Sequence, residues 1–342
     1  MIPVAPLIPT MTLICINSQR PTPNATTRKA ATRKQRPLGS WRIGSWEFPQ
    51  AIIEAVLKRQ RTGSVLCTSC GVLVGVNDDR CYNCNRRNPG LWGFAPALRA
   101  LGADLGFVPF VIGTCATLYV LTLIATPRLG GSIGMGGLFS AFSPSPQALF
   151  LFGESGAVPV FVAGRWWTVL SAAWLHAGVL HILFNMMAVR QLAPVTADLY
   201  GPGRTVIIYT AGAVLGFALS SFAGQYIPPL LVLRGGQFTV GASASIAGLI
   251  GAMLAYGHRT GSSMASSQAN SYILMLAIYG FMLPGIDNYA HAGGFAGGYF
   301  AARALDPMKP ERIDHIAMAV GCLALSIISI AVSVLHGLQF LR

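Results

Sequence analysis

Residues 166–189 read WWTVLSAAWLHAGVLHILFNMMAV, and no charged residue interrupts them. A membrane-spanning helix needs about 20 mostly apolar residues to cross about 30 Å of hydrocarbon, so this stretch is long enough to span a bilayer. Three polar side chains lie inside it, those of His176, His181 and Asn185. Polar groups are costly at that depth and are therefore candidates for function. The stretch predicts a membrane span that carries part of a site.

The same kind of stretch recurs along the rest of the chain. Of its 342 residues, 53% are hydrophobic and 10% charged, whereas a soluble protein usually carries about 25% charged residues. This composition excludes ordinary soluble architectures. The gaps between charged residues predict seven spans, at 105–127, 166–189, 205–233, 235–258, 260–286, 288–302 and 315–341.

One further uncharged stretch, 129–153, is interrupted by glycines and prolines that are expected to break any helix there. We interpret it as the start of a long loop over 128–165. Because irregular backbone cannot lie unpaired in lipid, the loop is expected at the membrane interface or against protein. Its apolar piece at 149–152 fits a partly embedded, lid-like element.

The positive charge is concentrated before the first span. The chain has a formal charge of +13, and residues 1–104 hold 14 basic and 5 acidic residues. With the N-terminus in the cytoplasm, 20 of the 24 basic residues fall on the inner side, as the positive-inside rule requires. We therefore expect a multi-pass protein, of the kind found in a bacterial inner membrane, with its C-terminus outside. No nucleic-acid partner is expected, and residues 1–62 are expected to form a disordered basic tail near anionic lipid.

Four cysteines form a pattern just before the first span. Cys67 and Cys70 make one CxxC pair, and Cys81 and Cys84 make a second. Two such turns bring four thiolates to one tetrahedral point, which predicts a structural zinc ribbon over 63–90. Disulfide or redox chemistry is the alternative, and a reducing cytoplasm disfavours it. We expect the ribbon to bind a cytoplasmic partner or to position the first span.

The sixth predicted span combines a histidine with a small-residue stripe. Ala290, Gly294 and Gly298 recur every four residues, the spacing that lets two membrane helices approach closely. His291 lies beside the first member of this stripe. It can therefore come within hydrogen-bond reach of a serine on the opposing helix.

The fourth predicted span supplies such a serine. Ser243 lies in a run of small residues that by itself suits helix packing as well as chemistry. Spans two, four and six all enter the membrane from the outer side, so their polar residues can share one site. Serine becomes a nucleophile when a histidine takes its proton, and the tetrahedral intermediate needs donors such as His181, Asn185 or the Ser243 backbone N–H. Asp287, one turn before His291, is expected at the span edge facing water.

These motifs, HxxxxHxxxN on span two, GxSx on span four and AHxGG on span six, resemble those of the rhomboid intramembrane serine proteases. The resemblance covers about 105–305. It implies an all-α membrane fold with a bundle of six transmembrane helices as the protease core, followed by one additional C-terminal transmembrane helix at 313–342. It also implies that catalysis needs no cofactor.

The resemblance assigns roles to individual residues. Ser243 is the expected nucleophile and His291 the base and then the acid. His181 and Asn185 are the expected oxyanion donors, and His176 supports them. Substrates would be transmembrane proteins, cut in or near their membrane-spanning segments.

The chain departs from the family pattern at two positions. Ala244 replaces the glycine that often follows the nucleophile, and Thr168 replaces an arginine after Trp167. Neither removes a reacting group. The alternatives are a non-catalytic rhomboid-like protein that binds membrane segments and a transporter, although the chain lacks an intramembrane carboxylate for a proton relay.

Overall fold

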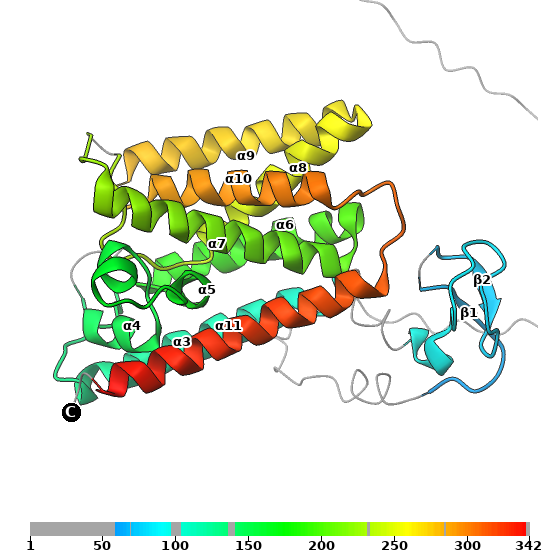
Figure 1. Cartoon of the computed structure of the whole chain (residues 1–342), viewed down its shortest axis with the longest axis horizontal. Coiled ribbons are helices and arrows are strands. Elements are labelled where there is room, and N and C mark those ends of the chain that lie inside the picture. Colours follow the sequence, from blue (N-terminus) through cyan, green and yellow to red (C-terminus); the bar gives the residue numbers. More distant parts are fainter. Residues whose placement is uncertain are drawn as a thin grey trace, which may run out of the picture. The chain divides into compact units, whose positions relative to one another are not determined.

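The structure is a computed structural model that describes residues 59–68, 70–96, 104–135, 141–230, 233–283 and 285–339. The expected basic tail lies outside these residues except at 59–62. The described chain comprises a small two-stranded element in its N-terminal part and a bundle of helices in its C-terminal part (Figure 1). The all-α fold predicted for the membrane part is confirmed.

The N-terminal element is an antiparallel pair of short strands. β1 (Ser64–Leu66) pairs with β2 (Leu73–Gly75), with Val65 opposite Val74. These two valines are buried together with Val76. A core of this size cannot stabilise a fold alone, so the element depends on a further cross-link.

Seven long helices form the bundle in the described residues, and they run roughly along one direction (Figure 1). They are α3 (Phe107–Arg128), α6 (Val179–Tyr200), α7 (Pro202–Tyr226), α8 (Ser243–Thr260), α9 (Ser263–Met282), α10 (Asn288–Ala304) and α11 (Ile313–Gln339). The shorter pieces are α4 (Pro146–Phe152), a π-helical turn (Val158–Val162), α5 (Thr168–Ser171) and the 3-10 turns Leu91–Gly93 and Ala172–Trp174.

Four of the described helices, α3, α6, α7 and α11, are long and apolar enough to cross a membrane by themselves. The helices at the fourth to sixth predicted spans, α8 to α10, do not meet that measure. Most residues of α8 are buried inside the bundle, and α10 is rich in glycine and packs against α7 and α8. A helix covered by other helices does not need apolar side chains all round, which explains the lower hydropathy of α8 and α10.

Glycines on two faces of α10 allow it to touch both neighbours. A methyl group added to Gly294 or Gly298 would collide with the backbone of α8 at Ala244 or Gly248. A methyl group on Gly293 or Gly297 would lie 2.6 Å from a carbonyl oxygen of α7. The predicted stripe therefore does face the helix that begins at Ser243, and a second stripe, which the sequence analysis missed, faces α7.

The prediction that residues 166–189 form one continuous span is wrong. The helical segment that contains α5 ends at Trp174, Leu175 is extended, and α6 begins only at Val179. Gly178, also extended, sits at this break, and α6 continues past Arg190 to Tyr200.

The fourth predicted span, 235–258, also begins later than predicted. Residues 233–242 are not helical, and their backbone pairs instead with the long loop, through Thr239 with Ser155 and through Gly236 with Ala157. These backbone bonds compete with helix formation. Ser243 is therefore the first residue of a helix, and its depth cannot be counted as helical rise from Arg234.

The prediction that 129–153 contains no helix is wrong over its last part. The helix α4 occupies Pro146–Phe152. The π-helical turn Val158–Val162 also lies in the predicted loop 128–165. Pro146 lies in the first turn of α4, where a missing N–H costs nothing. Ser145 caps this helix by accepting a hydrogen bond from the Ala148 backbone N–H at 3.3 Å. A proline at this position starts a helix rather than breaking it.

A buried arginine joins the loop to α11. Arg165 is 0% exposed, and its guanidinium donates to the backbone oxygens of Phe150 at 2.7 Å and Ser333 at 3.0 Å. Trp167 Nε1 donates to Ser333 Oγ at 3.1 Å, and Ser329 Oγ donates to the Trp167 oxygen at 2.7 Å. The C-terminal helix is thus bonded to the segment that leads into α5.

The glycine contacts of α10 give a stability prediction. Gly298→Ala should destabilise the protein, because the added methyl group meets backbone that cannot move aside. Overpacking of this kind costs about 1 to 3 kcal/mol, so the unfolding temperature in detergent should fall clearly. Gly321→Ala on α11 is the matched control, since a methyl group there meets nothing within 4 Å. Equal unfolding temperatures for the two variants would contradict this packing.

Candidate functional site

Ser243 lies at the N-terminus of α8 and is half-buried. The first backbone bond of this helix runs from Ile246 N to Ala242 O, so the N–H groups before Ile246 lack intrahelical partners. Such a helix start offers unpaired donors and a partial positive charge. The serine hydroxyl therefore stands next to groups that favour a developing negative charge.

Gly241 fixes the approach to this serine. Its backbone has a φ of +128°, which favours glycine, and its N–H donates to the Ala172 oxygen at 2.9 Å. A methyl group at Gly241 would lie 2.6 Å from His181 Nε2. The His181 ring is therefore packed directly on the backbone two residues before Ser243.

His291 lies in the first turn of α10 and is also half-buried. Its chain neighbour Ala290 lies close to Ala244, the chain neighbour of Ser243: a methyl group on Gly216 of α7 would lie 2.6 Å from the Ala290 oxygen and 2.7 Å from Ala244 Cβ. The starts of α8 and α10 thus meet at one point. No hydrogen bond joins Ser243 Oγ to the His291 ring here, and His291 Nδ1 is buried without a partner.

Asp287 does not orient the His291 ring. One carboxylate oxygen caps α10 by accepting from the Ala290 N–H at 2.9 Å, and the other accepts a hydrogen bond from Ser220 Oγ of α7. Ser220 Oγ in turn accepts from the Gly236 N–H at 2.9 Å. Asp287 is half-buried and links α10, α7 and the segment that leads to Ser243, and its facing water stays a prediction.

His176 and His181 lie together although they are not on one helix. Their ring centroids are 5.2 Å apart in an edge-to-face arrangement. His176 lies in the break before α6, is 0% exposed, and neither ring nitrogen has a hydrogen-bond partner. It supports the His181 ring by packing.

The hydrogen bond to His181 assigns its tautomer. The Ala177 backbone N–H donates to His181 Nδ1 at 3.3 Å. Since Nδ1 accepts, a neutral ring carries its proton on Nε2. His181 therefore presents an N–H donor toward Gly241, as a donor to an oxyanion near Ser243 should.

Asn185 is one turn further along α6 and is 6% exposed. Its Nδ2 donates to the His181 oxygen at 2.8 Å, and its Oδ1 is buried without a partner. The amide keeps a second N–H for another acceptor. Its predicted role as an oxyanion donor remains a prediction.

Sequence reasoning missed two supporting residues. Ser220 and Gly216 lie on α7, which carries none of the recognised motifs, and they meet the site through hydrogen bonds and through packing, respectively. Gly216 accommodates the junction of α8 and α10, and Ser220 connects Asp287 to the chain before Gly241. The serine gave no signal in the sequence because isolated serines are common in membrane helices.

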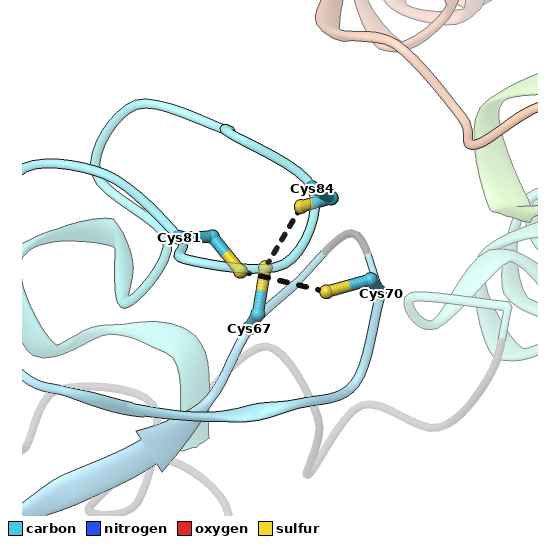
Figure 2. A group of neighbouring side chains, drawn as sticks. All are labelled: Cys67, Cys70, Cys81 and Cys84. Atoms are coloured by element: carbon cyan, nitrogen blue, oxygen red, sulfur yellow. Dashed lines mark hydrogen bonds between the residues drawn. The ribbon is translucent and has the colours of Figure 1, made fainter.

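The four predicted cysteine ligands lie together in the N-terminal element, as Figure 2 shows. Their sulfur atoms are all within 4.8 Å of one another, and the pairs Cys67–Cys84 and Cys70–Cys81 are 3.7 and 3.6 Å apart. A disulfide needs about 2.05 Å. Four sulfurs bound tetrahedrally at about 2.3 Å from zinc would be separated by about 3.8 Å. The group could therefore hold a metal ion, and its spacing fits zinc.

The two CxxC pairs are followed by the same closing hydrogen bond. Gly71 N–H donates to the Cys67 oxygen at 3.0 Å, and Asn85 N–H donates to the Cys81 oxygen at 2.9 Å. Gly71 and Asn85, each directly after the second cysteine of its pair, have φ values of +73° and +57°. Glycine adopts this conformation without strain at Gly71, and Asn85 is its counterpart, since asparagine tolerates it.

The thiols of Cys70 and Cys84 differ in acidity. A hydrogen bond from the Val72 backbone, with help from Asn83, lowers the pKa of Cys70 to about 6. Burial raises the pKa of Cys84 to about 11. Four thiols this close cannot all ionise without a cation nearby, and a bound metal deprotonates its thiol ligands.

Comparison with known proteins covers the helical part of the chain. Residues 163–307 match the rhomboid domain. Rhomboid protease GluP of Bacillus subtilis is 30% identical over 192 residues, which is 53% of this chain and 36% of that protein. RHOMBOID-like protein 7 of Arabidopsis thaliana is 33% identical over 138 residues, 39% of this chain and 41% of that protein.

A further relative, Rhomboid-like protease 5 of Toxoplasma gondii, is 30% identical over 162 residues, 46% of this chain and 18% of that protein. The chain therefore spans less than half the length of each of these three relatives. The matched region begins just before Arg165 and contains Ser243, His291 and the helices that pack around them. The chain thus contains a rhomboid domain at 163–307, and with its four membrane-capable helices it is an integral membrane protein.

Proposed function

We propose that this protein is an intramembrane serine protease that hydrolyses peptide bonds in or near transmembrane segments of other proteins. The observation that carries the proposal is the meeting of two helix starts, with Ser243 on α8 and His291 on α10 held together by glycine contacts. We also propose that the N-terminus is cytoplasmic and the C-terminus outside, which puts these helix starts in the outer half of the membrane.

The first half of the reaction forms an ester with the enzyme. His291 takes the proton of Ser243 Oγ as the oxygen attacks the substrate carbonyl carbon. The electron pair of the carbonyl moves to its oxygen, where the His181 Nε2–H, the Asn185 amide and the Ser243 backbone N–H can donate. The intermediate collapses, His291 gives its proton to the leaving amine, and the peptide bond breaks.

The second half restores the enzyme. His291 takes a proton from a water molecule, which attacks the ester carbonyl carbon. The bond to Ser243 Oγ breaks, and His291 returns the proton to this oxygen. The hydroxyl is regenerated and the second product leaves as an acid. Ser243 and His291 are not hydrogen-bonded in the structure, and such bonds often tighten only when substrate is bound.

Loss of either reacting residue should abolish cleavage. Ser243→Ala and His291→Ala should each lower the cleavage rate of a model transmembrane substrate in vesicles by about 10³-fold or more. Asn185→Ala should cost about 10²-fold if its amide donates to the oxyanion. Thr260→Ala at the far end of α8 is the control and should keep its activity.

If all variants cleave equally, the serine protease proposal is wrong. Labelling of wild type but not of Ser243→Ala by a fluorophosphonate probe would test the nucleophile independently of the substrate. Tight substrate binding with no labelling and no cleavage would instead favour the non-catalytic binding protein.

Asp287 and Ser220 should affect the rate by positioning alone. Asp287→Asn keeps an oxygen to cap α10 but cannot accept the Ser220 hydroxyl proton, so kcat should fall about tenfold with little change in KM. Ser220→Ala should give a similar loss, and the double variant should lose no more than either single variant. Asp314→Asn, at the exposed start of α11, is the control. A much larger loss for Asp287→Asn than for Ser220→Ala would instead mean that the carboxylate acts directly on His291.

We further propose that the four cysteines hold one structural zinc ion. The full chain, purified under reducing conditions, should contain about one zinc per molecule. Cys67→Ser and Cys84→Ser should lose most of this zinc, because a closed site needs all its ligands. Cys322→Ser on α11 is the control and should keep the metal. Absence of zinc from the wild type would contradict the proposal, as would full retention by the ligand variants. Whether the ribbon binds a cytoplasmic partner or positions α3 stays a hypothesis.

A further inference from the structure

A cavity of about 330 Å³ lies beside the long loop, away from the proposed catalytic residues. Its walls come from three parts of the chain: α4 with the segment after it, Phe238 in the stretch before α8, and Gly337 in α11. Most of the lining is apolar. The volume is at the lower end of the range for small-molecule sites in proteins.

Glu154 is the acidic group of this cavity. It lines the cavity, is 3% exposed, and its Oε1 is buried without a hydrogen-bond partner. Arg165 acts on it electrostatically, but in the part of the chain that the structure describes no salt bridge joins the two. The Arg165 guanidinium is instead bound to the backbone oxygens of Phe150 and Ser333. A buried carboxyl without a partner is costly unless something donates to it.

The residues on either side of Glu154 hold its backbone in place. Ser155, the next residue, is paired on both sides of its backbone with Thr239, at 3.0 and 2.7 Å. Gly153, the residue before it, has a φ of +103° and contacts the Ser171 and Ser333 side chains of two other helices. Both neighbours are fixed, so the backbone of Glu154 is held at the wall of the cavity.

The position of the cavity indicates which molecules can reach it. α11 has 27 residues, about 40 Å at 1.5 Å per residue, which matches a bilayer including its headgroup layers. Gly337 lies in the last turn of this helix. The cavity therefore lies at the end of a helix long enough to reach a headgroup layer, and Pro146, Gln147 and the 52% exposed Phe238 are the exposed residues of its lining.

We propose that this cavity is a binding site for the primary-amine headgroup of a phospholipid. The ammonium group would donate to Glu154, and the adjoining apolar part of the lipid would pack on Phe150, Leu151 and Val158. An amine suits the site because its cavity offers a buried acceptor and no basic side chain in its lining. The bound lipid would touch Phe238, five residues before Ser243, and so would support the stretch that leads to the nucleophile.

The binding should depend on pH in a defined direction. Burial raises the pKa of Glu154 to about 8, and the charge of Arg165 offsets part of that rise. His336, next to Gly337, packs its ring on Trp167. An ammonium group binds the ionised carboxyl, so retention of the amine lipid should increase as pH rises through about 8. Glu154→Gln should remove this dependence.

Native mass spectrometry of the full chain, extracted from vesicles of equal phosphatidylethanolamine, phosphatidylcholine and phosphatidylglycerol, tests the proposal. Wild type should retain phosphatidylethanolamine over phosphatidylcholine by about tenfold, the scale of one charge-assisted hydrogen bond. Glu154→Gln and the cavity-filling Val158→Phe should lose this preference. Asp314→Asn removes a carboxylate elsewhere and should behave as wild type, as should Ser243→Ala, which separates this test from the proposed hydrolysis.

Stepwise N-methylation of the headgroup tests the site in the wild-type protein, without any variant that could misfold. Retention should fall as the N–H donors are removed. Equal retention of phosphatidylethanolamine and phosphatidylcholine would overturn the proposal. A preference for phosphatidylglycerol would also overturn it, as would retention of a peptide in place of lipid or full retention by Glu154→Gln.

Discussion

The close approach of α10 to α7 and α8 is the constraint on which the rest of the bundle depends. Four glycines on two faces of α10 let backbone touch backbone, and larger side chains would separate the helices by more than the site tolerates. Ser243 and His291 each lie beside a residue of this contact, Ala244 and Ala290. The packing that stabilises the membrane fold therefore also sets the distance between the two proposed reacting groups.

Hydrogen bonds add to the glycine packing in holding the starts of α8 and α10 in place. The connection from Asp287 through Ser220 to Gly236 ties the start of α10 to the segment before Ser243, and Gly241 ties that segment to Ala172 and His181. Because the proposed catalytic histidine, His291, has no acidic partner on Nδ1, its ring orientation must come from such packing. This is why a carboxylate that never touches the ring can matter to its position.

The sequence was sufficient to predict the helical membrane fold, because sparse charges mark helix ends in any bilayer. It also predicted the cysteine cluster, whose spacing alone brings the sulfurs together. It failed where backbone bonds with distant segments decide the conformation. The stretch from Leu175 to Gly178 carries no charge and was predicted to be helical, yet it forms a break. Residues 233–242 pair with 155–158 rather than continuing a span. Such pairing has no signature in local periodicity.

The buried charges of the long loop were also beyond prediction, and they explain why α11 is more than an appended span. Arg165 reads as a boundary charge in the sequence, but its guanidinium is bound by carbonyls of α4 and α11. Among the described residues, no salt bridge joins it to Glu154, which is enclosed beside the same helices. The C-terminal helix accepts a hydrogen bond from Arg165 and helps to enclose Glu154. It thereby couples the loop, the cavity and the approach to Ser243 into one unit. Any ligand that bonds to Glu154 acts on that unit.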